Sequence, residues 1–502
     1  MNSRFNKKVF PAMVLTGIIV FFAGLLSSCS KSSQDDLLDS VPHNAKIIAA
    51  VNLDMILKNA GCKFNNGTIT LSDDLAALRD RYCQDRADAV NMVLLTASTL
   101  DLKRVILYRL DNLDPVITFK IKNKEIFTAL ATGAAGGMES VGHFSVFNLD
   151  GCVIMTSDDI GWISTSTSNI EQSMARKGKK RHQVFDNIVS FINASNQAIA
   201  MAVNLHTAID AAPRNGIVQG FENTWITGEA TLSDNILGLE FKAVNNEGEA
   251  LDVSPYIGEV SPDFLRYTPD NTQFLTAFGN IAGMNELYSV IRTALSPELR
   301  ETIDPLVPYI NEIDGTTSIA INPVATGDNL SQFSFDTWDV TFMTHLPQRS
   351  VDALNSIINH LSTPNTATDD QSVMIGNQEV FYGNYDGYFA ASTRPISSDY
   401  NNSFAMATQG SRAMIVVDIP YNSETMKAFD LPYGVYLSIK LESSALKGKM
   451  KFNGSNSPFL AALASAAAYY ARANPLPDLV TETVTDEYHD DSMIEDELQP
   501  VK

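Results

Sequence analysis

The sequence predicts an α+β protein built as two similar halves, each of two mostly antiparallel sheet-plus-helix modules. Landmarks recur in the same order in both halves: Pro42 with Pro269, Thr118 with Thr341, Asp150 with Asp386, and Gly238 with Gly448. Each half also carries a long hairpin in which apolar and polar residues alternate, a pattern typical of strands that bury one face. Together these observations predict an internal duplication.

The landmarks and the prolines place the domain boundaries. We expect a first half at 41–255 with modules at about 41–180 and 184–252, a joint at 256–267, and a second half at 268–470 with modules at about 268–395 and 404–470. Prolines at 255, 262 and 269 mark the joint, because proline interrupts both helices and sheet ladders.

Helices and strands are expected to alternate within each half. The apolar run Ala45–Leu53 predicts a strand, and Asp54 is expected to cap the helix that follows. Residues 72–97 carry apolar side chains at near-helical spacing and predict one helix. Ser457-Pro458 predicts the start of a packed helix through 459–471, since proline is favoured at the first helical position.

Hairpins are predicted at four places. Asp-Gly lies between apolar strands at 148–151 and at 384–387, where glycine accepts the positive φ of a tight turn. Longer hairpins are expected at 225–241 and at 435–453, each with one face buried and one face in water.

The N-terminus is typical of a bacterial secretory leader. Arg4, Lys7 and Lys8 precede an apolar run from 9 to 26, and Leu26-Ser27-Ser28-Cys29 resembles a bacterial lipobox. We expect residues 1–28 to be a signal peptide, with Cys29 lipidated and held in the membrane by its acyl chains. An uncleaved transmembrane anchor is the alternative, which Pro11 and Gly17 disfavour because they interrupt the apolar run.

Polar segments flank the predicted fold. Residues 29–40 are expected to form a flexible tether, and residues 475–502 an acidic disordered tail. Ser40 and Ser492 each follow Asp in short sequences that resemble the O-glycosylation sequon of Bacteroidota. Acidic residues after Cys29 resemble a surface-export signal, for which an ordinary linker is the alternative.

Charge excludes one class of partner. The chain has a formal net charge of −22, with 58 acidic residues against 36 basic ones. A surface of this sign repels phosphate backbones, so no nucleic acid is expected as a partner. The expected partners are the lipid anchor in the membrane and envelope proteins or glycans.

Cysteines and histidines give little chemistry. Beyond Cys29, the nearest pair for one disulfide is Cys62 with Cys83, and free buried thiols are the alternative. The seven histidines show no HExxH and no close pair at ligand spacing, so no metal site and no cofactor are expected.

Two strings look like fragments of a penicillin-recognising serine enzyme. Ser444-Ala-Leu-Lys447 matches SxxK and Ser233-Asp234-Asn235 matches SDN, but they stand in the wrong order and no KTG exists. Both are expected in hairpin turns, so no catalytic residue is assigned. The basic run 176–182 is expected to be a solvated helix terminus, with phosphate or lipopolysaccharide binding as the alternative.

The opening Val41-Pro42 and Ala45–Leu53, the Asp-Gly hairpins and the lipobox together resemble an uncharacterised family of tandem-domain Bacteroidota lipoproteins, called domain of unknown function 4836. The resemblance covers about residues 41–470. It implies envelope location and a tandem α+β fold, and it implies no activity or site.

The expected function is that of a membrane-anchored exported lipoprotein with a non-catalytic binding or assembly role. The expected location is the outer membrane, facing the periplasm or the cell surface. An envelope hydrolase whose site assembles only in the fold, or a carrier of an apolar ligand, are the alternatives. An exposed apolar patch would favour the binding protein, a hollow pocket the carrier, and a Ser/His or carboxylate pair the enzyme.

Overall fold

The computed structural model describes most of residues 36–473. The described ranges are 36–65, 68–82, 87–110, 114–149, 151–174, 183–204, 224–245, 247–281, 312–324, 337–361, 372–375, 378–398 and 404–473, with isolated residues between some of them. Among these residues no helix is long and apolar enough to cross a membrane.

The described helices are short and lie between the strands. They are α2 (Asp36–Asp39), α3 (Leu53–Asn59), α4 (Asp73–Tyr82), α5 (Ala87–Ser98), α6 (Lys124–Ala135), α7 (Thr167–Met174), α8 (Gln183–Ala194), the 3-10 helix η3 (Pro262–Tyr267), α13 (Gln348–Leu361), α14 (Ala405–Thr408), α15 (Glu424–Ala428) and α16 (Phe459–Ala473).

Nineteen strands form one sheet, and β2 (Lys63–Asn65) with β3 (Thr68–Thr70) forms a separate two-stranded one. Those of the large sheet up to residue 244 are β1 (Ile47–Val51), β4 (Leu100–Arg109), β5 (Val116–Ile121), β6 (Glu139–Val141), β7 (Phe144–Leu149), β8 (Cys152–Ser157), β9 (Ile160–Ser164), β10 (Ile199–Asn204), β11 (Trp225–Ser233) and β12 (Ile236–Val244). The remainder are β13 (Phe274–Phe278), β14 (Thr317–Pro323), β15 (Trp338–His345), β16 (Ser372–Ile375), β17 (Gln378–Tyr385), β18 (Tyr388–Ser392), β19 (Ala413–Ile419), β20 (Gly434–Leu441) and β21 (Leu446–Asn453).

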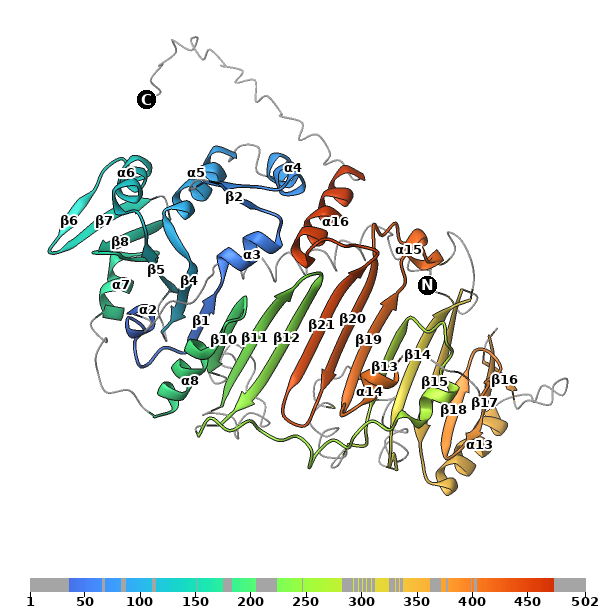
Figure 1. The fold of residues 1–502 in the computed structure, drawn as a ribbon. Helices are drawn as coiled ribbons and strands as arrows, with labels where there is room; N and C mark the ends of the chain where they lie inside the picture. The colour runs from blue at the N-terminus through green and yellow to red at the C-terminus, as the bar shows by residue number, and fades with distance from the viewer. Residues whose placement is uncertain are drawn as a thin grey trace, which may run out of the picture.

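The pairings of the large sheet are all antiparallel and join the strands into a single row. In space the order is β6-β7-β8-β9-β5-β4-β1-β10-β11-β12-β21-β20-β19-β13-β14-β15-β18-β17-β16. Figure 1 shows the central strands side by side across the molecule. The mixed α+β class is therefore confirmed, with one continuous antiparallel sheet as its main feature.

The two faces of the central sheet differ in chemistry. Because directly paired residues of neighbouring strands point to the same side, the registers assign every side chain to a face. On one side, which we call the apolar face, the alternate residues of β11, β12, β21, β20, β19, β13, β14 and β15 include no charged side chain. On the opposite face, β11, β12, β21 and β20 carry lysines and glutamates. On β19, β13, β14 and β15 the same face contributes buried side chains, such as Val416 and Leu275, to a hydrophobic core.

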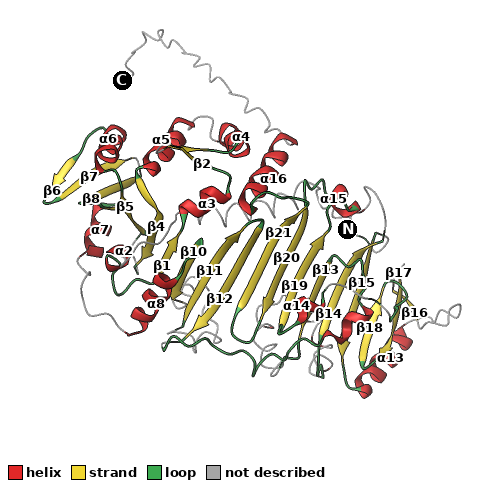
Figure 2. Ribbon diagram, in the orientation of Figure 1, coloured by secondary structure: helices red, strands yellow, loops and turns green. Residues whose placement is uncertain are grey.

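Helices cover only part of the apolar face. Ile56 of α3 and Phe459, Leu460 and Leu463 of α16 pack over sheet residues that include Ile199 and Leu237. Figures 1 and 2 show α3 and α16 lying along one end of the central strands. The predicted packed helix at 459–471 is confirmed, since eight of its side chains from Phe459 to Ala468 are buried.

One local expectation was wrong. The cap of α3 is Asn52, whose side chain accepts a hydrogen bond from Met55 N, and Asp54 lies inside the helix. The helical structure expected at 72–97 is present in α4 and α5, and residues 83–86 between them lie outside the described residues.

The fold also begins earlier than predicted. Leu37 and Leu38 of α2 are buried in the same core as Ile48 and Tyr108, although they fall within the expected tether 29–40. Two leucines in a polar stretch gain enough from burial to dock a short helix. The expected tail 475–502 lies outside the described residues.

Candidate functional site

The candidate site is the part of the apolar face that the described helices leave open. We call it the open strip and define it by Phe241, Ile319, Ile415, Leu441 and Leu446. Phe241, Leu446 and Leu441 are consecutive cross-strand partners on β12, β21 and β20. Ile415 and Ile319 lie on β19 and β14, where each is paired with Thr276 of β13.

The open strip is exposed to a degree that is unusual for such residues. Ile415 is 50% exposed, Leu446 is 41% exposed and Ile319 is 37% exposed, while Phe241 and Leu441 are half-buried. None of the five belongs to a cluster of buried apolar residues among the described parts of the chain. Contiguous exposed apolar surface of this kind marks interaction sites.

Local sequence explains why these residues share one face. Val435, Leu437, Ile439 and Leu441 alternate with Tyr436, Ser438 and Lys440 along β20, and pairing continues the pattern into β19 and β21. We expected this alternation to bury the apolar side. That expectation was wrong for the open strip, because α3 and α16 pack on the other end of the strands.

On the face opposite the open strip, lysines and glutamates on or next to β12, β20 and β21 form ion pairs with one another. Glu442 lies 2.7 Å from Lys447 Nζ and 3.0 Å from Lys440 Nζ, and Glu240 lies 2.7 Å from Lys242 Nζ. Burial acts to raise the pKa of Glu442, but hydrogen bonds from Lys447 and Lys440 outweigh it and leave that pKa below its usual value. On β12, β21 and β20 this face is therefore suited to water. The open strip lies on the other, uncharged face of the central sheet.

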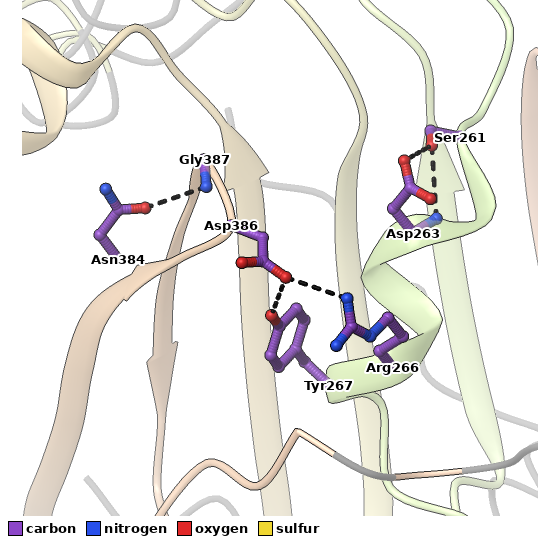
Figure 3. A network of polar contacts seen from close by, with 7 residues as sticks. All are labelled: Ser261, Asp263, Arg266, Tyr267, Asn384, Asp386 and Gly387. Carbon is purple, nitrogen blue, oxygen red and sulfur yellow. Dashed lines mark hydrogen bonds and ion pairs between the residues drawn. The ribbon is translucent and has the colours of Figure 1, made fainter.

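A polar clasp ties the joint segment to a hairpin (Figure 3). Asp386 accepts a hydrogen bond from Tyr267 OH at 2.7 Å and from Arg266 Nη1 at 3.0 Å. Burial, followed by the contact with Asp386, raises the pKa of Tyr267 to about 12. Asn384 Oδ1 accepts from Gly387 N at 3.2 Å, which closes the turn. These contacts fix η3 against β17 and β18.

An Asp–His pair lies beside this clasp. His345 Nδ1 lies 2.6 Å from Asp314 Oδ1, and the His345 ring packs edge-on against Tyr388 with centroids 5.2 Å apart. No serine, threonine or cysteine side chain of the described residues hydrogen-bonds to the His345 ring. The pair orients an imidazole, and it offers the hydrolase alternative no nucleophile in contact.

Several of the predicted sites lie outside the described residues. They are Cys29, Cys83, Ser492 and the basic run 176–182. Ser40 is described and buried, and its hydroxyl donates to Leu37 O at 2.5 Å. In this fold Ser40 is closed to a glycosyltransferase, because α2 docks on the core.

Cys62 is a free, buried thiol, so the structure lends no support to its pairing with Cys83. Burial raises the pKa of the Cys62 thiol. Within the described ranges, no three His, Cys, Asp or Glu side chains gather closely enough to hold a metal ion.

Both serine-enzyme strings lie in turns, as expected. Asp234, between β11 and β12, has a φ of +43°, and its carbonyl accepts from Phe459 N at 2.9 Å. Lys447 is the second residue of β21 and pairs with Glu442. Neither string opens a helix, which the SxxK chemistry requires.

Comparison with known proteins assigns no family. No family model and no curated protein matches the sequence. Three solved structures of a protein named TP0453, in crystal forms I, III and IV, are 9–12% identical and have TM-scores of 0.25–0.27. The similar regions cover 41–42% of this chain and 80–81% of that one. At this level the likeness transfers neither fold nor function.

Proposed function

We propose that this chain is an exported lipoprotein, anchored through Cys29, that binds another protein of the cell envelope through the open strip. The observation that carries the proposal is the exposed Ile415, Leu446 and Ile319 on a sheet face without charge. Removing such surface from water is favourable by roughly 25 cal/mol per Å² of apolar area. The leader and the lipobox support the location at the envelope.

Site-specific photocrosslinking tests the proposal. A benzoyl-phenylalanine placed at position 415 in intact cells is expected to form a crosslink to a different protein. The matched control is position 126 on α6, because Ile126 is 49% exposed but lies away from the strip. Leu446→Lys should abolish the crosslink from 415. Crosslinks confined to the chain itself, or equal at 415 and 126, would refute the proposal.

We also propose that the sheet consists of two equivalent halves that meet between β12 and β21. Outward from this junction, the order β12-β11-β10-β1-β4-β5-β9-β8-β7 on one side is matched by β21-β20-β19-β13-β14-β15-β18-β17-β16 on the other. The matching strands also follow the same sequence order, apart from the extra edge strand β6. Such an order supports duplication of one unit.

The strand registers support the same proposal independently. Ile47 and Phe274 open their strands at equal distances from Pro42 and Pro269. Carrying the pairings outward from these two strands makes Asp158 equivalent to Asp386. Both are turn residues of positive φ, at +53° and +50°, a conformation that few residues other than glycine adopt.

A side-chain contact recurs at equivalent positions. Asp114 accepts a hydrogen bond from Thr165 Oγ1 at 2.5 Å, and Asp339 accepts one from Thr393 Oγ1 at 2.5 Å. The registers make Asp114 equivalent to Asp339, and Ser164-Thr165 equivalent to Ser392-Thr393. A shared contact at positions found from backbone pairing alone supports common descent of the halves.

Under this proposal the registers shift three of the four sequence landmarks, and only Pro42 and Pro269 keep their match. Thr118 corresponds to Met343 rather than Thr341, Gly448 to Phe241 rather than Gly238, and Asp386 to Asp158, one hairpin beyond Asp150. Apolar strands of period two look alike when shifted, so sequence matching misplaced them.

A further inference from the structure

Asp339 is a buried carboxylate without a basic partner among the described residues. It is 4% exposed, and its oxygens accept hydrogen bonds from Thr393 Oγ1 at 2.5 Å, Ser392 Oγ at 3.4 Å and Asn322 Nδ2 at 3.4 Å. Buried charges are normally paired with an opposite charge or bound to a cation. The long contacts from Ser392 and Asn322 do not compensate a full negative charge.

Unpartnered oxygens lie beside this carboxylate. Asn322 is the direct cross-strand partner of Asp339, and Gln273 lies opposite Asn322 at the end of β13, on the same face of the sheet. Asn322 is 3% exposed and Gln273 is 6% exposed, yet Asn322 Oδ1 and Gln273 Oε1 have no hydrogen-bond partner. Buried acceptors of this kind call for a ligand or an ion.

The equivalent position in the first half holds a basic residue. Asn204 N donates to Lys46 O and Asp418 N donates to Gln273 O, both at 2.8 Å, so Lys46 occupies the position of Gln273. The first half thus has a lysine at this position, whereas the second half has neutral Gln273 beside Asn322 and Asp339. This comparison rests on the proposed equivalence of the halves. The observations on Asp339 and on the oxygens of Asn322 and Gln273 do not depend on it.

We infer that Asp339, Asn322 and Gln273 bind a hard cation, for which Ca²⁺ is the probe. Carboxylate and amide oxygens are the ligands that Ca²⁺ takes in proteins. The oxygen and nitrogen ends of the Asn322 amide have the same shape, so a half-turn places Oδ1 where Nδ2 now lies, 3.4 Å from Asp339 Oδ2. Two oxygens at this separation fit the ligand sphere of one ion. Tyr400 adjoins the site, since burial and then the charge of Asp339 raise its pKa.

Thermal unfolding of the purified full chain tests the inference. After chelation, 1 mM Ca²⁺ should raise Tm by about 2–4 °C, because an ion that binds only the folded state stabilises it. Asp339→Asn should remove this increase. The matched control is Asp114→Asn, which changes the exposed equivalent in the first half and should retain it. An increase that survives Asp339→Asn, or no increase with Ca²⁺, overturns the inference.

A second variant guards against a folding defect in Asp339→Asn. Gln273→Lys recreates the arrangement of Lys46 and should raise Tm in chelated buffer while removing the response to Ca²⁺. Tb³⁺ provides a direct readout, because Tyr400 and the neighbouring Trp338 would sensitise its luminescence. The site is supported if the unaltered chain shows Tb³⁺ emission that added Ca²⁺ lowers, and Gln273→Lys does not. Equal emission from both proteins overturns the inference. Failure of the crosslinking experiment at Ile415 leaves these results unaffected.

Discussion

At the scale of single residues, Gly161 shows how tightly one strand pair is packed. Gly161 of β9 is paired with Phe119 of β5, whose side chain is 2% exposed. A Cβ added at Gly161 would overlap the Phe119 ring. The small residue is therefore required by its neighbour and not by its own backbone conformation.

We predict that Gly161→Ala destabilises the protein by about 1–3 kcal/mol, the usual cost of overpacking a core. Gly238→Ala is the matched control, because its nearest neighbour would be Thr231 Cβ at 3.6 Å, an ordinary contact. Its effect should stay within about 0.5 kcal/mol. Urea midpoints of both variants check this prediction, and equal midpoints would contradict it.

Glu442 provides a pH-dependent prediction. Its lowered pKa means that its contribution to stability is present above the unfolded-state pKa of about 4.3 and is lost as the pH falls through the folded-state value. Glu442→Gln should cost no more than about 1 kcal/mol at pH 7, since all three side chains of the cluster with Lys440 and Lys447 remain partly in water. The difference from the unaltered chain should shrink as the pH falls from about 4.3 through the lower folded-state pKa of Glu442. Urea unfolding at neutral pH and through this acid range measures it, and a constant difference would argue against the ion pairs.

At the scale of elements, α16 joins the sheet to the helices of the first module. Phe459 is fully buried and stacks on Phe452 of β21 with centroids 5.4 Å apart. Leu460 N also donates to Asn59 Oδ1 of α3 at 2.8 Å. One helix near the C-terminus thus completes a core that begins with β1.

Phe459→Ala should therefore cost about 3–5 kcal/mol, as a large aromatic leaves a cavity that cannot close. Arg472→Ala on the exposed side of α16 serves as the control and should change stability by less than about 0.5 kcal/mol. Equilibrium unfolding followed by circular dichroism gives both values. A small loss at Phe459 would mean that α16 is not part of the cooperative core.

At the scale of the whole molecule, the anchor and the sheet are close neighbours along the chain. The described part of the chain begins with α2 at Asp36, and six residues lie between Cys29 and this helix. A fully extended segment of that length spans at most about 20 Å. An acylated Cys29 would therefore hold the sheet near the bilayer surface.

Cys29→Ala should abolish acyl labelling and move the protein out of the membrane fraction. The reason is that two or three acyl chains provide stable anchoring, and the variant has no thiol to receive them. Labelling with a fatty-acid analogue, followed by fractionation, measures both effects. Ser27→Ala keeps a small residue before the cysteine and is the control. Unchanged labelling in Cys29→Ala would contradict the lipobox.

The sequence by itself determined the local elements that depend on near neighbours. Alternation along 435–453 predicted β20 and β21, and Ser457-Pro458 predicted the start of α16. Period-two and helical patterns are properties of adjacent residues, so they survive without knowledge of the fold.

Only the tertiary structure decided how the strands pair and which surfaces stay open. Sequence matching placed Asp386 opposite Asp150, whereas under the proposed duplication the strand pairings place it opposite Asp158. The residues around Ile415 in the sequence do not indicate that α3 and α16 cover the other end of its sheet face. The sequence also does not indicate that Asp339, Asn322 and Gln273 are neighbours in the sheet. Such contacts join residues tens or hundreds of positions apart, so they are set by the folded arrangement and not by local pattern.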